Sequence, residues 1–349
     1  MTDGSESKPR GLVPSSGQAL VHRGLRELSV AAEVLSRRGT WNARRVFSDT
    51  REALTISSAG QIATHAVDRS AIEIFGVDTG PSTVIPVTGK ALTWHPGCFV
   101  WRPNCEHLIV ALSGSNGDDR AQIHLVDVQQ RAITHSVPGG FGLGAWSPQG
   151  TWFATSPDVN LWTVEGKRLQ PISAFQFESS TEYLLGCRSL AFSPDEHLLF
   201  VVAEVGVKAT NVFAHWDELF MFEVPALRLL RRVGPPDTVL SLSWTHKQQE
   251  VLMTCTYGKS FVVNTEDASV KELPFTAGVC CCHPSDSQLC AFADRKTVFL
   301  ADVARGMKIA EHPIDDDRDE IESLTISWSQ DGQRLFSASG LGQSYTYRL

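Results

Sequence analysis

The segment Ala145–Ile172 reads AWSPQGTWFATSPDVNLWTVEGKRLQPI and decides how we interpret the rest of the chain. It holds four short apolar runs, which are separated by turn residues at 147–150, 156–158 and 165–167. Short apolar runs bounded by Gly, Pro, Ser and Asp are typical of strands joined by tight turns. The segment therefore predicts one small four-stranded antiparallel sheet, which needs similar neighbours on both faces to bury its apolar side chains.

The first turn of this sheet recurs along the chain, each time after an apolar strand. The residues that lead the seven copies are Phe47, Trp101, Trp146, Phe192, Trp244, Cys282 and Trp328. They stand 54, 45, 46, 52, 38 and 46 residues apart, close to the roughly 40 to 45 residues of a propeller blade. In the second copy, Trp94 begins a similar turn, and the spacing favours Trp101. The first copy matches least well, because 57–68 fits either a long hairpin or an insertion.

A second marker, an apolar third strand, keeps the same order in all seven copies. These strands are expected at 72–75, 123–127, 160–162, 218–222, 260–264, 298–302 and 344–347. Two independent markers in one order predict an all-β fold: a seven-bladed β-propeller whose blades are four-stranded antiparallel sheets.

Over roughly residues 40 to 349 the chain resembles the WD-repeat family of β-propellers. The resemblance rests on the repeat length, on the aromatic-Ser-Pro turn, and on third strands that end in Asp, Asn or Glu in several copies. No third strand ends in Trp-Asp and no repeat opens with Gly-His, so the chain looks like a diverged member, in which only Trp162 stands at the third-strand tryptophan position. The resemblance implies a ring of blades that serves as a platform for binding other proteins.

The last copy ends the chain after its third strand, so another segment must supply its fourth. We expect residues 19–36 to do so by pairing beside Tyr345–Tyr347, which closes the ring with an N-terminal strand. Deleting residues 1–36 is then expected to unfold or aggregate the protein. Residues 1–18 are rich in Ser, Gly, Pro and charge and are expected to form a flexible tail, so 19–349 is expected to be a single propeller domain.

The composition and charge of the chain favour a globular protein and argue against a nucleic-acid binder. Hydrophobic residues make up 42% and charged residues 20% of the 349 residues, as in a globular protein with an ample core. The net charge of -8 argues against a general nucleic-acid binder, which needs a surplus of Lys and Arg on one face. The start of the chain lacks the apolar core of a secretion signal, and no run is long enough to span a membrane, so we expect a cytoplasmic protein.

Motifs for catalysis or metal binding are weak. The chain has no Gly-x-Ser-x-Gly elbow, no phosphate-binding Gly loop followed by Lys, and no His-Glu-x-x-His. Cys280, Cys281 and Cys282 are successive residues of an expected strand, and with His283 and Cys290 they form the best candidate metal cluster. A zinc site needs four converging ligands, whereas adjacent strand residues point to opposite faces. We therefore expect these thiols to pack the core, and we expect no cofactor.

These observations favour a non-enzymatic platform for protein interactions. A long insertion at 204–217 in the fourth copy is expected to form a loop that carries the aromatic side chains of Phe213, His215 and Trp216. The acidic segment 315–320, with Asp315, Asp316 and Asp317, is expected to face solvent as a rim. Aromatic side chains give much contact area at small entropic cost. The alternative for Trp216 is that it folds back over the fourth blade.

Two other functions stay open. A scaffold subunit would be held in an assembly by the tail, so deleting residues 1–18 would abolish assembly and leave the fold intact. A propeller enzyme of the metal-dependent hydrolase or lactonase type would bind a divalent ion in the axial channel. Its carboxylate ligands would come from different blades, so no local motif would reveal them.

Overall fold

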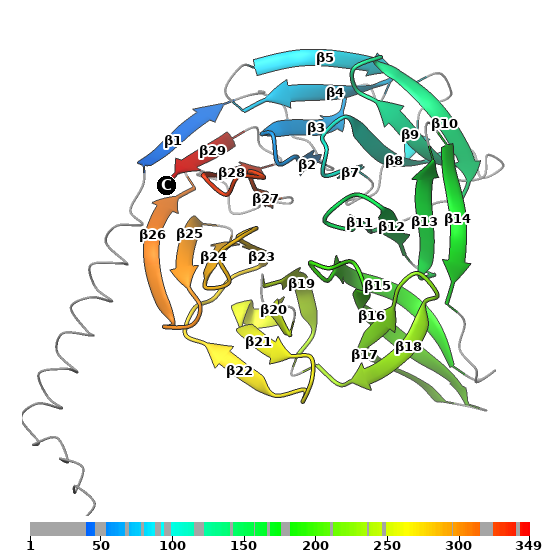
Figure 1. Ribbon diagram of the computed structural model, residues 1–349, viewed down its shortest axis with the longest axis vertical. Helices are drawn as coiled ribbons and strands as arrows, with labels where there is room; N and C mark the ends of the chain where they lie inside the picture. The colour runs from blue at the N-terminus through cyan, green and yellow to red at the C-terminus, as the bar shows by residue number, and fades with distance from the viewer. Residues whose placement is uncertain are drawn as a thin grey trace, which may run out of the picture. The chain divides into compact units, whose positions relative to one another are not determined.

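The computed structural model describes residues 40–45, 54–66, 70–77, 80–87, 92–93, 99–114, 122–139, 142–156, 158–165, 168–175, 182–209, 212–235, 237–245, 249–294, 296–314, 324–339 and 343–349. These residues form seven antiparallel sheets arranged as a ring (Figure 1). Each sheet is one blade of a β-propeller, and its strands run from the centre of the ring outward in chain order, except that the outermost strand of blade seven is β1. The all-β, seven-bladed fold predicted from the sequence is confirmed.

Each blade has four strand positions. The innermost strands are β2 (Leu54–Ile56), β7 (Phe99–Trp101), β11 (Gly144–Trp146), β15 (Glu182–Phe192), β19 (Val239–Trp244), β23 (Val279–Cys282) and β27 (Leu324–Trp328). In blade two, β6 (Leu92–Thr93) shares this position, because β6 and β7 both pair with β8. The second strands are β3 (Gln61–His65), β8 (His107–Gly114), β12 (Trp152–Thr155), β16 (Leu198–Ala209), β20 (Glu250–Cys255), β24 (Leu289–Ala293) and β28 (Arg334–Ser339).

The third and the outermost strands follow in the same order, from blade one to blade seven. The third strands are β4 (Ala71–Gly76), β9 (Gln122–Asp127), β13 (Asn160–Glu165), β17 (Val212–Glu223), β21 (Ser260–Asn264), β25 (Thr297–Asp302) and β29 (Gln343–Arg348). The outermost strands are β5 (Gly80–Pro86), β10 (Ala132–Pro138), β14 (Arg168–Ala174), β18 (Arg228–Val233), β22 (Val270–Leu273), β26 (Met307–Pro313) and β1 (Thr40–Arg45). All seven predicted third strands are therefore present, and 145–172 forms blade three as expected.

In four blades the first turn begins with a serine and has the same hydrogen-bonding scheme. In blade three, Ser147 Oγ accepts a hydrogen bond from the backbone N–H of Trp152 at 2.9 Å, and the Gly150 N–H donates to the Ser147 carbonyl at 2.8 Å. The serines of the equivalent turns, Ser57, Ser193 and Ser329, accept from the backbone in the same way. Gly150 has a φ of +75°, a conformation that glycine adopts at no steric cost. The serine and the glycine of this turn therefore recur because the backbone conformation favours them.

The first copy requires a correction. Its innermost strand, β2, ends at Ile56, and the turn that follows is Ser57–Gly60, closed by the N–H of Gly60 on the carbonyl of Ser57. Phe47-Ser48-Asp49, predicted as this turn, lies outside the described residues and before β2. The turn of the first copy was therefore predicted at the wrong position; the residue before it, Ile56, is apolar but not aromatic. In blade two, the turn follows Trp101 as predicted.

The ring is closed by an N-terminal strand, as predicted, but by a different one. Strand β1 pairs antiparallel with β29 from Thr40↔Arg348 to Arg45↔Gln343. It occupies the position that we predicted for residues 19–36 (Figure 1). The Trp41 ring lies 4.7 Å from the Tyr347 ring and 5.3 Å from the His312 ring of blade six, so β1 also joins the last two blades. Residues 19–36 and the predicted tail 1–18 lie outside the described residues.

The hydrophobic core consists of layers between adjacent blades. Between blades four and five, Phe200 and Leu219 pack with Trp244 and Met253, all of which are buried. In two blades the recurring tryptophan also bonds to its neighbour, since Trp244 Nε1 donates to the Ala191 carbonyl of the preceding blade at 2.9 Å. Trp328 Nε1 donates to the Cys281 carbonyl in the same manner. Because each blade is covered by its neighbours, the ends of the strands remain available on two opposite faces of the ring.

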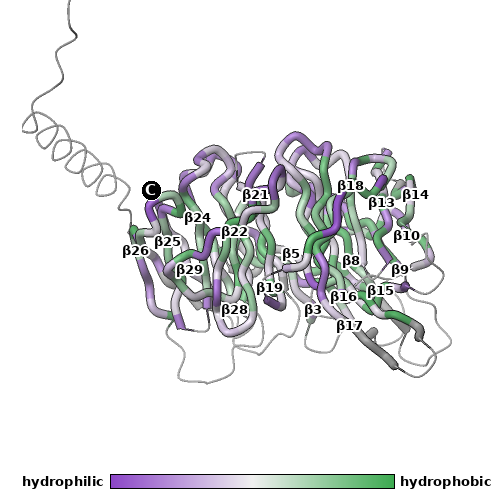
Figure 2. Tube along the Cα trace, turned by 90° about the horizontal axis from the view of Figure 1, so that it is seen from below, coloured by the Kyte–Doolittle hydropathy of each residue, from purple (hydrophilic) through white to green (hydrophobic). Residues whose placement is uncertain are grey.

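We name these faces by their connections. The turn face carries the connections between first and second strands, such as 147–151, and the hairpin face carries those between second and third strands, such as 256–259. The two kinds of connection lie at opposite ends because the strands of each blade are antiparallel. Figure 2 shows β16 and β17 projecting beyond the neighbouring strands on the hairpin face. No helix in the described part of the chain is long and apolar enough to cross a membrane.

Candidate interaction surface

Blade four is the part of the ring that departs most from the repeat. Strands β16 and β17 each have 12 residues and β15 has 11. Of the segment 204–217, predicted as a loop, residues 204–209 and 212–217 are instead paired strand, with Glu204 opposite Asp217 and Val205 opposite Trp216. Alternating residues such as Val201, Ala203 and Val205 are fully buried, so the apolar pattern of a strand continues into the insertion. The insertion therefore lengthens the blade.

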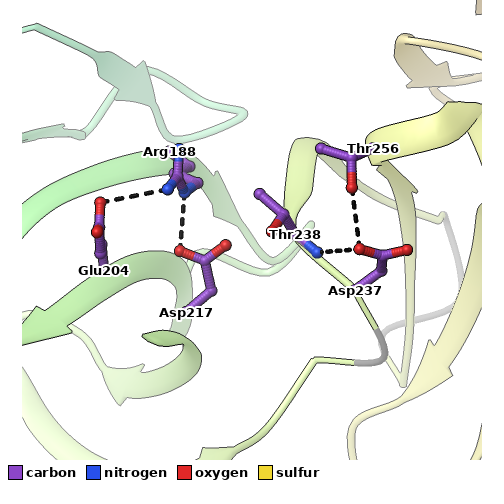
Figure 3. Close-up of polar contacts among 6 residues, drawn as sticks. All are labelled: Arg188, Glu204, Asp217, Asp237, Thr238 and Thr256. Carbon is purple, nitrogen blue, oxygen red and sulfur yellow. Dashed lines mark hydrogen bonds and ion pairs between the residues drawn. The ribbon is translucent and has the colours of Figure 1, made fainter. Parts of the chain in front are cut away.

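The extension carries an ion cluster on the side that faces blade five. Arg188 on β15 donates from Nε to Asp217 Oδ1 at 2.7 Å and from Nη2 to Glu204 Oε2 at 3.2 Å (Figure 3). The hydrogen bond to Asp217 raises the pKa of Arg188 above its usual value. The Asp217 side chain is only 7% exposed, and its Oδ2 has no hydrogen-bond partner among the described residues. Arg188 thus neutralises a carboxylate that is largely removed from water, which fixes the three strands in register.

A second ion cluster lies on the opposite side of the same sheet, toward blade three. Arg232 on β18 contacts Glu182 at 3.0 Å and Glu218 at 2.6 Å, and its guanidinium lies 5.4 Å from the Phe220 ring centre. Hydrogen bonding to Glu182, the larger cause, and to Glu218 raises the pKa of Arg232. Trp216 Nε1 donates to the second oxygen of Glu218 at 2.9 Å. These contacts hold the indole at the sheet surface, where it remains 39% exposed.

Blade five contributes a tightly held turn beside the first cluster. Asp237 Oδ1 accepts hydrogen bonds from the Thr238 N–H at 2.8 Å and from Thr256 Oγ1 at 2.9 Å (Figure 3). The bond from Thr238, followed by that from Thr256, lowers the pKa of Asp237. The turn Thr256–Gly258 (η1) then places Tyr257 in a left-handed conformation with φ +60°, and its side chain is 92% exposed. Few residues other than glycine adopt a positive φ. Those that do are found more often than average at functional sites.

Several large apolar side chains are exposed at this end of blades four and five. They are Leu185, Trp216, Leu240 and Tyr257, with exposed fractions of 45%, 39%, 47% and 92%. Single exposed apolar residues are ordinary, whereas several of them around charged groups on one face are typical of a protein-binding surface. We call this set, together with the Arg188 and Arg232 clusters, the blade-four surface.

The predicted site residues have different positions in the structure. Trp216 is on β17 within the blade-four surface. The backbones of Phe213 and His215 are on the same strand, and their side chains lie outside the described part. Asp315, Asp316 and Asp317 also lie outside the described residues. Sequence reasoning missed Tyr257, Arg188 and Arg232, because single residues from separate strands leave no local motif; the Tyr257-Gly258 pair between two apolar strands was the one available signal.

The cysteine cluster is part of the core between blades. Cys280 and Cys290 are buried, and Cys282 packs against the same group of apolar residues, with 3.2 Å between the sulfur atoms of Cys290 and Cys282. Burial raises the pKa of the Cys280 thiol well above its ordinary value. His283 bonds neighbouring backbone, as expected for a turn histidine. Within the described ranges, no three His, Cys, Asp or Glu side chains are grouped as a metal site would require.

Comparison with known proteins gives no family for this chain. No protein-family model matches it, and none of the curated proteins matches it either.

Proposed function

We propose that the protein is a non-enzymatic platform for protein interactions, of the kind that WD-repeat propellers provide, and that the blade-four surface is its recognition site. The observation that carries the proposal is the exposure of two aromatic side chains at the hairpin face, Trp216 on the side of blade four toward blade three and Tyr257 on blade five. Tyr257 is held in left-handed backbone by a turn that Asp237 anchors, so its backbone is already ordered before a partner covers its side chain. Exposed Trp and Tyr are the residues most often found to dominate binding energy.

The electrostatics of the surface support binding in preference to catalysis. Arg188 and Arg232 are each paired with two carboxylates, and such pairs orient side chains and select partners by charge. The net charge of -8 supports protein partners in preference to nucleic acid.

The test is affinity purification of the full chain from its source cells, with bound proteins identified. Three variants, Tyr257→Ser, Leu185→Ser and Trp216→Ala, are compared with Val84→Ser as the matched control, because Val84 is 58% exposed on blade one. Loss of the same partner in the first three variants and retention in Val84→Ser would support the proposal. A partner recovered equally by all variants, or no stoichiometric partner at all, would contradict it. Deleting residues 1–18 in parallel tests the scaffold reading, in which the tail holds the partner.

A further inference from the structure

We propose that β17 binds an extended basic segment of a partner protein, which adds a fifth strand to blade four. This inference rests on the proposed function and specifies the kind of partner. The observation that carries it is the outer edge of β17. Strand β18 pairs with β17 only from Leu219 to Glu223, whereas β17 begins at Val212. Among the described residues, no strand pairs with the outer edge of 212–218.

This open edge is particular to blade four. In blades one, two, three, six and seven, the outermost strand pairs along the whole third strand, as with β4 and β5 or β25 and β26. In blade five it covers Ser260 to Val263 of a strand that ends at Asn264. Strand β18 stops early because Gly234-Pro235-Pro236 follows Val233, and proline has no N–H to continue a ladder.

An unpaired edge of seven residues is long enough to bind a peptide through its backbone. Every second residue of 212–218 directs its N–H and C=O away from β16, in the plane of the sheet. Such edges are usually shortened, covered or twisted away from solvent, because they pair with any extended chain. Addition of a strand by a partner uses these main-chain groups for affinity and the adjacent side chains for selectivity.

The side chains beside the edge determine the chemistry of the partner. Trp216, exposed on the side toward blade three, offers a flat surface for an apolar side chain of the added strand. On that side Arg232 faces two carboxylates, Glu182 and Glu218, and on the other side Arg188 faces Glu204 and Asp217. On the side toward blade three, the two carboxylates thus exceed the one guanidinium group. The matching segment alternates apolar residues with Lys or Arg.

The same charges disfavour a second copy of this chain as the occupant. Two copies joined edge to edge would bring the surplus carboxylates of both β17 strands together, and each chain has a net charge of -8. Like charges that face each other across a strand pair are destabilising. A separate basic segment avoids this repulsion, so we assign the edge to a heterologous partner.

The test begins with selection of random 12-residue peptides displayed on phage against the full chain, followed by synthesis of the enriched peptides. We expect them to alternate apolar and basic residues and to bind with an affinity that falls as salt is raised. Methylating the backbone nitrogens of one alternate set of residues is expected to weaken binding by about tenfold or more, and methylating the other set to have little effect, because only one set faces β17.

Variants of the chain locate the binding site. Replacing residues 206–215 by Asn-Gly joins Val205 to Trp216 by a tight hairpin turn and removes most of the edge; peptide binding is then expected to be lost, with the melting temperature reported alongside. Trp216→Ala keeps the edge and is expected to weaken binding by about tenfold. Leu230→Ala is the matched control, because Leu230 is 40% exposed on β18 of the same blade.

The outcomes separate this inference from the proposed function. Peptides that bind the shortened hairpin as well as the full chain, equal effects of methylating either set of nitrogens, or enrichment of no peptide would overturn the assignment to β17. A self-associating chain in analytical ultracentrifugation that becomes monomeric on shortening would overturn it in favour of a second copy. In each case the affinity purification above still decides whether the protein is an interaction platform.

Discussion

His283 of blade six donates a hydrogen bond from Nε2 to the carbonyl oxygen of Gly332 in blade seven, at 2.9 Å. Its Nδ1 accepts from the backbone N–H of Ser285 at 3.2 Å and of Asp286 at 3.0 Å, which assigns the proton to Nε2. Arg102 of blade two makes the equivalent contact, from Nε and Nη2 to the carbonyl of Gly150 in blade three. Side chains from the first turns therefore join neighbouring blades across the turn face.

Gly332→Ala should destabilise the fold by about 2–4 kcal/mol. A Cβ at this position would lie 2.3 Å from the His283 ring, and the φ of +71° is unfavourable for alanine. Urea unfolding measures the effect, with Gly234→Ala as the control, because Gly234 has no atom within 4 Å of such a Cβ. In a His283→Ala background the cost of Gly332→Ala should fall. Equal costs in both backgrounds would show that the ring contact is unimportant.

Removing the closing strand should destabilise the propeller, whereas removing the preceding residues should not. Deletion of 1–38 leaves β1 and its pairing with β29 intact, but deletion of 1–45 leaves β29 with an unpaired edge. Trp41→Ala should cost about 3 kcal/mol or somewhat less, since Trp41 is half-buried against Tyr347 and His312. Thermal melting and light scattering give the readout. Equal melting temperatures for the two deletions would exclude β1 as the closing strand.

Arg188→Met should reduce the free energy of unfolding by about 1–3 kcal/mol. The substitution leaves Asp217, which is 7% exposed, without the guanidinium that neutralises it. Breaking a deeply buried ion pair would cost more. Arg188 is 40% exposed, so solvent screens the pair and lowers the expected loss of stability. Arg228→Met is the matched control, since the Arg228–Glu223 pair on the same blade is exposed on both sides and should have no measurable effect. Equal unfolding curves for the two variants would contradict a structural role for the Arg188 cluster.

Asp331 should titrate below its ordinary pKa of 3.8 in the folded protein, because Ser329 Oγ donates a hydrogen bond to its carboxylate at 2.6 Å. A carboxylate with a lowered folded pKa stabilises the fold above the unfolded pKa, and this contribution is lost as pH falls through the folded pKa. NMR titration of the carboxyl carbon should therefore give a lower midpoint in buffer than in urea. Ser329→Ala should raise the midpoint in buffer; an unchanged midpoint would mean that the hydrogen bond does not control the titration.

The buried cysteines should react slowly with iodoacetamide in the folded protein. Burial raises the pKa of the Cys255 thiol to about 12, so almost no thiolate is present at pH 8. Cys105, which is partly exposed, serves as the internal comparison. Peptide mapping after timed labelling should find Cys105 modified first and Cys255, Cys280 and Cys290 modified only after unfolding. Rapid labelling of Cys255 at native conditions would contradict its position in the core.

Sequence reasoning succeeded where a local pattern has one physical cause. The turn after Trp146 recurs because its serine must accept a backbone hydrogen bond and a later residue must adopt positive φ, and both requirements leave a signature. The third strands were found because apolar residues must fill the layers between blades. The error in blade one followed from the same logic, since the scheme at Ser57 needs no aromatic residue before it.

Features that depend on pairing between distant segments could not be assigned. The need for a closing strand followed from the missing fourth strand of blade seven, but its identity depends on register with β29, and the 40–45 segment TWNARR has too few apolar residues to reveal it. The Arg188 and Arg232 clusters join residues from different strands, so their spacing in the sequence is arbitrary. The 204–217 insertion was located correctly, but its aromatic and polar composition did not indicate that both strands continue through it.

The pairing of β1 with β29 also fixes when the fold can be completed during synthesis. The ribosome makes Thr40–Arg45 before the other strands of the propeller, whereas its partner β29 follows all of them. Pairings between residues so distant in sequence form slowly and require the whole intervening chain. A nascent chain therefore carries an unsatisfied strand throughout its elongation, and any product that terminates before β29 keeps two exposed edges for chaperones and proteases to recognise.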